Sequence, residues 1–516
     1  MRETRTPARG SAILTLIALF AFVAAPGVLA QSPPSHDTMV VAVPALPTEL
    51  DPDFAESAVK GNVLRQVLDL PTWYDHRGVL HGWVFESWEV IDDGLTWRFA
   101  IREGLEFHSG TPVNAETVKF TFDRMLDEEL LARGADNQFP HRVGLVSVDV
   151  IDEYVLDITT DEPNSLVTAR LYVVYLVDPA FYADATPSEA ATMARGGGPY
   201  EIVAFVPDDY VEFVRNDDYW NGAPDIERIV VRAVPERSSR IAMLETGEVD
   251  IALDLGPDDI PILQSIPGVN VAATESSRRI GLAFNQREER FQDKRVRQAF
   301  NYAIDFDEIN EALLYGMASR LQTYRGTDVC SDPDMEPYPY DPERALALLE
   351  EANFPMDEEV VIHVGGHQGY RIQVVQAMAS QLQRLGINAR TNVVEASVFT
   401  QMVGNRDFTG LAELGLGGRG VPAQDATVFA FGGFWNPTGW EDEAAHEFNE
   451  LLGEIQAEFD PDVVCEMTKV LEAIAYEHAP WLYSHHPLEI AGVNERIDWA
   501  PRIDAQLFWW TANWAR

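Results

Sequence analysis

The stretch Gly415–Gly420 has the spacing G-x-G-x-x-G, which lets a backbone approach the phosphates of a dinucleotide. It follows the apolar run 408–416, but Pro422 would interrupt the helix that such a site requires. We therefore interpret it as a flexible or ligand-approaching loop. The sequence contains no G-x-S-x-G, H-E-x-x-H or G-x-x-x-x-G-K-[ST] motif. We predict no catalytic residues and no cofactor.

Histidines are the second candidate for chemistry, as metal ligands. His485 and His486 are adjacent, and neighbouring side chains on a strand point to opposite faces, so they cannot easily share one ion. His363 and His367 are four residues apart, but two glycines separate them at a predicted strand end. Because metal ligands must converge, we predict ordinary surface or loop histidines and no metal site.

Aromatic side chains next to turn residues are the third candidate, because such rings form good ligand walls when a few polar groups accompany them. An ordinary core role is the alternative for each of them. They are Trp73-Tyr74, Phe434-Trp435, Trp440 and Trp509-Trp510.

Length and charge limit the class of protein. The 516 residues are 46% hydrophobic, which is ordinary globular composition, and the chain is too long for one core, so we expect at least two lobes. Lys and Arg number 38 against 83 Asp and Glu, a net charge of −45. A chain this acidic is a poor partner for nucleic acid or for an anionic membrane surface.

The first thirty residues have the features of a secretory signal peptide. Arg2, Arg5 and Arg9 precede an apolar run at 12–25, which is too short to span a bilayer. Val28-Leu29-Ala30 then supplies small residues for a cleavage site. No cysteine follows the run, so we expect no lipoprotein anchor. We predict an exported protein, periplasmic or extracytoplasmic, that is soluble after cleavage near Ala30. An uncleaved anchor is the alternative.

Cys330 and Cys465 are the two cysteines of the chain. In an oxidising compartment two cysteines favour a disulfide, but geometry decides whether they pair. The sequence leaves both a disulfide and two separate buried thiols open.

Strands and helices alternate along most of the chain, which predicts α/β lobes. Gly196–Pro199 is the strongest break, either a freely bending loop or a crossing between lobes. The clearest predicted elements are a strand at 40–43, a helix capped by Asn114, a hairpin over 146–158, a helix over 236–245 stopped by Gly247, a helix over 370–385 stopped by Gly386, and helices over 441–459 and 461–478.

A long run from Phe85 to Ala115 resembles the signature of the extracytoplasmic solute-binding proteins of peptide and nickel ABC importers, family 5. It includes Phe85-Glu86-Ser87-Trp88-Glu89-Val90 and, further on, Phe107-His108-Ser109-Gly110-Thr111-Pro112. The resemblance covers residues 38–495. Further segments in the family's order are Leu50-Asp51-Pro52, Gly197-Gly198-Pro199-Tyr200, Arg215-Asn216-Asp217-Asp218-Tyr219-Trp220, Thr246-Gly247-Glu248-Val249-Asp250, 291–304 and Tyr340-Asp341-Pro342.

The resemblance implies an α/β, bilobed fold of the periplasmic-binding-protein type, similar to type II, with an extra subdomain inserted in lobe I. Carried over by segment order, the signal peptide is 1–30, lobe I is 36–70 with 196–283 and 487–516, the inserted subdomain is 71–195, and lobe II is 284–486.

The resemblance also implies a receptor that captures a small solute and delivers it to the permease subunits and cytoplasmic ATPase of an ABC importer. A di- or oligopeptide is the leading solute, and an oligosaccharide or a metal chelate is the alternative. We expect a monomer that is not an enzyme and binds no nucleic acid; a secreted hydrolase is the remote alternative.

The sequence departs from the family's peptide binders at one motif. They commonly carry a Trp followed three residues later by an Asp that pairs with the peptide α-amino group, whereas Leu416 and Arg419 stand there in this chain. Either Asp425, the nearest carboxylate, takes that role, or the protein does not recognise a free amino terminus. Arg419 could prefer a carboxylate, or form an ordinary salt bridge. The candidate ligand-binding residues are Arg419, Asp425, Trp435, Phe434, Trp73 and Leu46.

Overall fold

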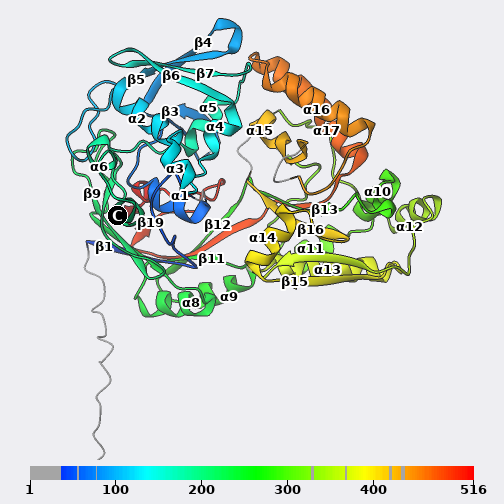
Figure 1. Ribbon diagram of the computed structural model, residues 1–516. Helices are drawn as coiled ribbons and strands as arrows, with labels where there is room; N and C mark the ends of the chain where they lie inside the picture. The colour runs from blue at the N-terminus through cyan, green and yellow to red at the C-terminus, as the bar shows by residue number, and fades with distance from the viewer. Residues whose placement is uncertain are drawn as a thin grey trace, which may run out of the picture.

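The computed structural model describes residues 37–516, apart from 55–56, 77, 327–329, 367–368, 418–420 and 432–435. Two α/β halves lie side by side, and a further subdomain lies above the first of them (Figure 1). The bilobed α/β architecture expected from the sequence is therefore confirmed.

The first half is built on a seven-stranded sheet with β1 at its centre. β1 runs parallel to both of its neighbours, and the other pairings are antiparallel. In sheet order the strands are β12 (Val269–Glu275), β18 (Leu488–Asn494), β11 (Ile251–Leu255), β1 (Thr38–Val43), β10 (Arg228–Ala233), β9 (Tyr210–Arg215) and β8 (Tyr200–Val206).

Both faces of β1 are buried, because successive side chains point to opposite sides of a strand. Met39 and Val41 pack into the core cluster that contains α1 (Ala58–Leu64). Val40 and Ala42 pack on the other side against α8 (Arg237–Thr246) and α9 (Ile260–Ser265). The predicted buried strand is thus confirmed, and Gly247 ends α8 in the left-handed conformation that its position in the sequence predicted.

The upper subdomain is a four-stranded antiparallel sheet covered by α2 (Ala115–Met125). Asn114 caps α2 as predicted, and its partner in the capping box is Thr117. The predicted hairpin is confirmed by β6 and β7. The strands, in order, are β4 (Phe85–Ile91), β5 (Thr96–Ile101), β7 (Val155–Thr160) and β6 (Leu145–Asp152).

The second half is built on a five-stranded sheet with helices on both faces. Its strands, in order, are β15 (Ala389–Val394), β14 (Val360–Gly365), β16 (Leu411–Leu416), β13 (Arg279–Phe284) and β17 (Trp481–His485). Its main helices are α10 (Lys294–Tyr302), α11 (Phe306–Leu313), α12 (Pro342–Glu351), α13 (Arg371–Arg384), α14 (Ala396–Gly404), α16 (Glu443–Gln456) and α17 (Pro461–His478).

The chain crosses between the two large sheets twice, at 276–278 and at 486–487. β13 pairs within the five-stranded sheet, although the predicted lobe I range 196–283 included residues 279–283 of that strand. The predicted lobe boundaries otherwise stay predictions. Within the described part of the chain, no helix combines the length and the apolar character needed to cross a lipid bilayer.

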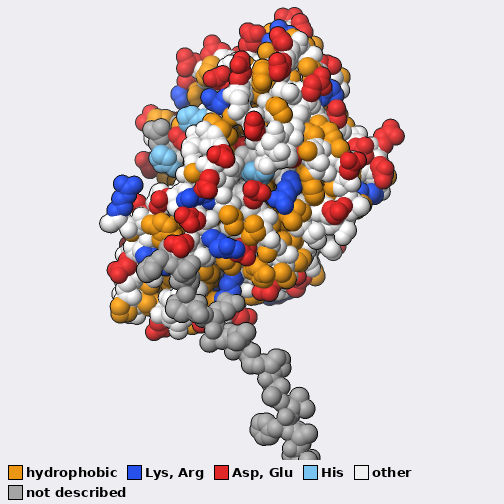
Figure 2. All heavy atoms as spheres, turned by 90° about the vertical axis from the view of Figure 1, so that its left-hand side faces the viewer, with side chains coloured by type: hydrophobic (Ala, Val, Ile, Leu, Met, Phe, Trp, Pro, Cys, Tyr) orange, Lys and Arg blue, Asp and Glu red, His pale blue; other side chains and the backbone are white. Residues whose placement is uncertain are grey.

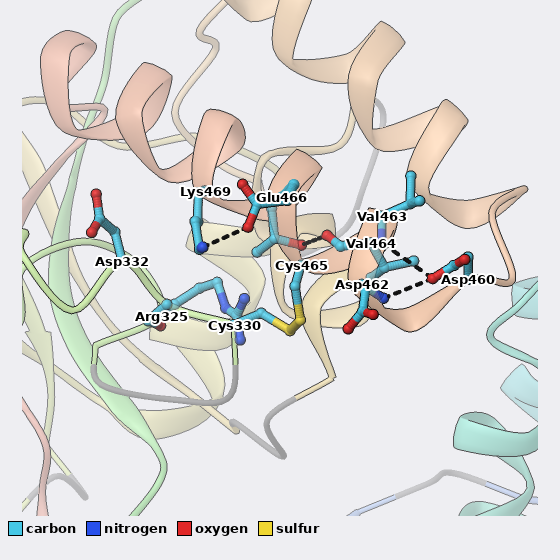
Figure 3. Close-up of a disulfide and its surroundings, with 12 residues drawn as sticks. Arg325, Cys330, Asp332, Asp460, Asp462, Val463, Val464, Cys465, Glu466 and Lys469 are labelled. Carbon is cyan, nitrogen blue, oxygen red and sulfur yellow. Dashed lines mark hydrogen bonds and ion pairs between the residues drawn. A yellow bond between two sulfur atoms is a disulfide. The ribbon is translucent and has the colours of Figure 1, made fainter.

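Cys330 and Cys465 form a disulfide, with their Cα atoms 4.7 Å apart (Figure 3). The bond joins the segment after Arg325 to α17. Seven residues further along α17, Glu472 accepts hydrogen bonds from the hydroxyl of Ser331 and the backbone N–H of Asp332. The choice that the sequence left open is therefore resolved in favour of a disulfide.

Candidate functional site

A cavity of about 640 Å³ lies between the two halves. Pro44–Leu46 line it directly after the carboxyl end of β1, which is where ligands commonly bind in open α/β sheets. Most of its wall is apolar. Apolar lining side chains are Leu46, Val63, Leu253, Ile490 and Trp509 from the first half, and Phe399, Val403 and Leu414 from the second.

Arg371 and Glu413 form a buried ion pair in the wall supplied by the second half. Arg371 begins α13 and Glu413 lies in the middle of β16, and the Arg371 Nη1 atom is 3.0 Å from the Glu413 Oε1 atom. Gly415 makes room for this contact, because a Cβ atom there would lie 2.2 Å from Arg371 Nη1. The pair therefore depends on the missing side chain at position 415.

A second pair, Arg278 and Glu489, lies where the chain crosses between the halves. The Arg278 Nη1 atom is 3.7 Å from the Glu489 Oε1 atom. Burial raises the pKa of Glu413 and of Glu489, and the charges of both Arg278 and Arg371 oppose the rise in each. Each arginine thus acts on both carboxylates, so the four side chains form one group, which we call the charge quartet.

Several atoms of the charge quartet lack a hydrogen-bond partner among the described residues. Among the described residues, neither carboxylate oxygen of Glu413 has a hydrogen-bond partner, although the side chain is fully buried. The ion-pair contact of Arg371 Nη1 lacks hydrogen-bond geometry as well. Buried charged groups are normally satisfied, so an incomplete pair in the wall of a cavity is suited to a ligand that supplies donors and acceptors.

Leu46 and Trp73 were both predicted to contact the solute. Leu46 lines the cavity. Trp73 lies outside the lining, in a cluster of rings with Trp83 at 5.0 Å and Trp510 at 5.6 Å between ring centroids. Trp73 also contacts a residue of the cavity wall, because the Arg502 guanidinium lies over its ring and Arg502 lines the cavity.

Asp425 is buried in α15 (Pro422–Ala426), away from the cavity lining. Arg279 donates a hydrogen bond of 3.0 Å from Nη2 to its carboxylate. The predicted ammonium-binding role of Asp425 stays a prediction, but its charge already has a protein partner. Pro422 does not interrupt a helix, contrary to the expectation from the sequence; it is the first residue of one.

Arg419, Phe434 and Trp435 lie outside the described residues, and so does His367. Their predicted roles remain untested. Among the described residues, no group of three or more His, Cys, Asp or Glu side chains could hold a metal ion.

Sequence reasoning missed Arg371, Glu413, Arg278 and Glu489. Glu413 did carry a signal, since it is a single charge inside the apolar run 408–416 that was identified as a strand. Arg371 carried none, because an arginine in the first turn of a helix is commonly solvent-exposed.

Comparison with known proteins shows which sequences and structures this chain is similar to. The family described as bacterial extracellular solute-binding proteins, family 5 middle, matches residues 79–433. Heme-binding protein A of Haemophilus influenzae is 26% identical over 80% of this chain and 80% of its own length. Di/tripeptide-binding protein 2 of Pseudomonas aeruginosa is 26% identical over 93% of this chain and 94% of its own length.

Solved structures with the same fold include HbpA2 from Haemophilus parasuis, with a TM-score of 0.79 and 21% identity over 93% of this chain and all of that one. NikA from Brucella suis, solved with Fe(III)-EDTA, has a TM-score of 0.82 and 19% identity over the same shares of the two chains. These similarities concern the fold alone.

Proposed function

Since this chain belongs to the bacterial extracellular solute-binding proteins of family 5, we propose that it captures a di- or oligopeptide between its halves and delivers it to the permease of an ABC importer. The observation that carries the proposal is the composition of the cavity, in which apolar walls from both halves surround the charge quartet. A di/tripeptide-binding relative that aligns over 93% of the chain supports the same class of solute.

A peptide matches the cavity in both charge and polarity. The described lining residues include three arginines and three carboxylates, so their formal charges sum to zero, which suits a solute of zero net charge. A zwitterionic peptide has no net charge, yet it offers an ammonium group, a carboxylate and apolar side chains. The lining residues with these charges are Arg278, Arg371, Arg502, Asp254, Glu413 and Glu489.

We assign the ammonium group of the peptide to Glu413. Glu413 lines the cavity, and its buried carboxylate lacks hydrogen bonds from the described residues, whereas Asp425 already accepts one from Arg279. An ammonium group would supply the donors that Glu413 lacks. Arg371 or Arg278 would then be free to bind the peptide carboxylate in a fork geometry.

Capture involves no bond breaking in this proposal. The two crossings at 276–278 and 486–487 serve as the hinge, and a solute that contacts both halves favours the closed arrangement. We propose that the protein is exported as a monomer, loses its signal peptide near Ala30, and meets the permease outside the cytoplasm.

Native mass spectrometry of the purified protein, followed by denaturation to release any bound solute, tests the proposal. Released masses with amino-acid spacings would support a peptide. Masses with hexose spacings, a porphyrin or a metal chelate would replace the peptide with that class. A protein that is purified empty is then titrated calorimetrically with a pool of tripeptides, and an absence of binding there contradicts the peptide proposal.

A further inference from the structure

The upper subdomain, which contains the four-stranded sheet, touches the second half at the end of α16, away from the hinge crossings (Figure 1). The backbone N–H of Ser165 donates a hydrogen bond of 2.7 Å to the carbonyl of Gln456, the last residue of α16. The Ser165 hydroxyl lies 3.4 Å from the carbonyl of Ile455. Carbonyls in the last turn of a helix lack partners within the helix, so this end of α16 gains a donor from the subdomain.

Apolar side chains extend the contact on both sides of these hydrogen bonds. The Phe459 ring lies 5.7 Å from the Trp97 ring in β5. It also covers Gly94, where a Cβ atom would lie 2.7 Å from the Phe459 Cε2 atom. Leu166 is buried in the core cluster of the second half together with Leu452 and Ile455 of α16.

The subdomain presents this surface on a rigid loop. Asn164 holds the loop through three hydrogen bonds: its carbonyl accepts from Trp97 Nε1 at 3.0 Å, its side-chain oxygen accepts from the Leu166 N–H at 2.9 Å, and its amide donates to the carbonyl of Val143 at 3.3 Å. Because these three bonds lie within the subdomain, they do not depend on contact with α16.

We propose that Trp97, Ser165, Leu166, Gln456 and Phe459 form a clasp that holds the two halves together when the cavity is closed. The subdomain belongs to the first half and α16 to the second, and the chain joins the halves only at the hinge crossings among the described residues. A rotation about the hinge that opens the cavity therefore has to separate Ser165 from Gln456 and Phe459 from Trp97. The clasp rests on the bilobed geometry and not on the identity of the solute.

Hydrogen exchange resolved to single amides, on the full mature chain, tests the clasp. The Ser165 amide should be protected in the wild-type protein, since its partner is the Gln456 carbonyl. Phe459→Ala should speed its exchange about tenfold or more, and Phe459→Leu should have a smaller effect, while the amides of β5 keep their wild-type protection. The matched control is Val463→Ala, which truncates an exposed side chain four residues further on and should change nothing.

Two results would overturn the clasp: exchange of the wild-type Ser165 amide at the rate of an unprotected amide, or equal rates in wild type and Phe459→Ala. Loss of protection throughout β5 in Phe459→Ala would signal misfolding, and the Phe459→Leu protein then decides the question. None of these readouts needs a known solute, so failure of the clasp is distinguishable from failure of the peptide proposal.

Discussion

At the scale of single residues, Glu413 is the side chain whose role is easiest to isolate. Glu413→Gln keeps the shape but removes the charge, so it should weaken binding of a tripeptide about tenfold or more, equivalent to ~1.4 kcal/mol. N-acetylation of the same tripeptide should weaken wild-type binding by a similar factor, because it removes the ammonium group. Calorimetry on the two proteins with the two ligands measures both effects.

Combining Glu413→Gln with N-acetylation of the tripeptide tests whether Glu413 contacts the ammonium group. In the Glu413→Gln protein, N-acetylation should cost little further affinity, since the partner of the ammonium group is already gone. Asp425→Asn is the comparison for the alternative assignment. If it removes the preference for a free amino group while Glu413→Gln does not, then Asp425 holds the ammonium group and our assignment is wrong.

Asp69 is a second residue whose environment predicts behaviour that can be measured. Tyr219, Trp83 and Trp220 donate hydrogen bonds of 2.9, 3.0 and 3.3 Å to its carboxylate. Burial nevertheless raises the pKa of Asp69 from 3.8 to about 7, because the three donors do not offset the lost hydration. The folded protein therefore holds this proton at a pH where the unfolded chain has released it.

The sign of the pH dependence follows from this difference in protons bound. Between pH 4 and pH 7 the contribution of Asp69 to the free energy of unfolding should fall as pH rises, by up to ~1.4 kcal/mol per pH unit. Asp69→Asn removes this contribution, so urea unfolding of wild type and variant should converge or cross as pH increases. Asp208→Asn, at an exposed carboxylate, is the control. A constant difference between wild type and Asp69→Asn across this range would contradict the prediction.

At the scale of elements, the disulfide fixes an otherwise irregular segment onto α17. The bond closes a loop of 135 residues, so Cys330→Ser with Cys465→Ser should lower the free energy of unfolding by about 2–5 kcal/mol. Part of the segment should stay in place, because Glu472 also binds Ser331, Asp332 and the Thr323 hydroxyl. Urea unfolding of the double variant and of the wild type, with and without reductant, measures the effect. A reductant that destabilises the double variant as much as the wild type would show that the disulfide is not its target.

Elements were predictable where their signals are local. Gly386 ends the helix predicted over 370–385, and the observed α13 spans 371–384, because a glycine with positive φ needs only its own neighbours to stop a helix. The partners within the cavity were not predictable in this way. Arg371 and Glu413 come from a helix and a strand that meet only after the five-stranded sheet has formed, and no local pattern records that contact.

At the scale of the whole molecule, the family signature predicted the bilobed fold, and the two core clusters around β1 show how the sequence specifies its first half. The signature could not predict the cavity lining, because Arg371, Glu413 and Glu489 lie outside the segments that resemble the family and meet only in the folded chain. The charge quartet has members in both halves and at one crossing between them, so in the proposed mechanism recognition and closure depend on the same side chains. A variant that weakens the quartet should therefore affect closure as well as affinity.

The net charge of −45 is a property of the whole molecule with a consequence of its own. Carboxylates are spread over the face seen in Figure 2 and outnumber the lysines and arginines there. Mutual repulsion of like charges destabilises a compact state, and dissolved salt screens that repulsion over a distance that shrinks from about 14 Å at 0.05 M to about 3 Å at 1 M. The charge quartet is less affected, because buried pairs are screened less than exposed charges.

The melting temperature should therefore rise by several degrees between 0.05 and 1 M NaCl, while the unfolding transition stays cooperative. Sucrose at matched osmolality is the control, since it stabilises through exclusion from the surface without screening charge. A larger rise in NaCl than in sucrose, concentrated below 0.3 M where the screening length changes most, would identify surface repulsion as the cause. A melting temperature that is flat or falls over this range would mean that the acidic side chains are already far enough apart, or well enough paired, for repulsion to matter little.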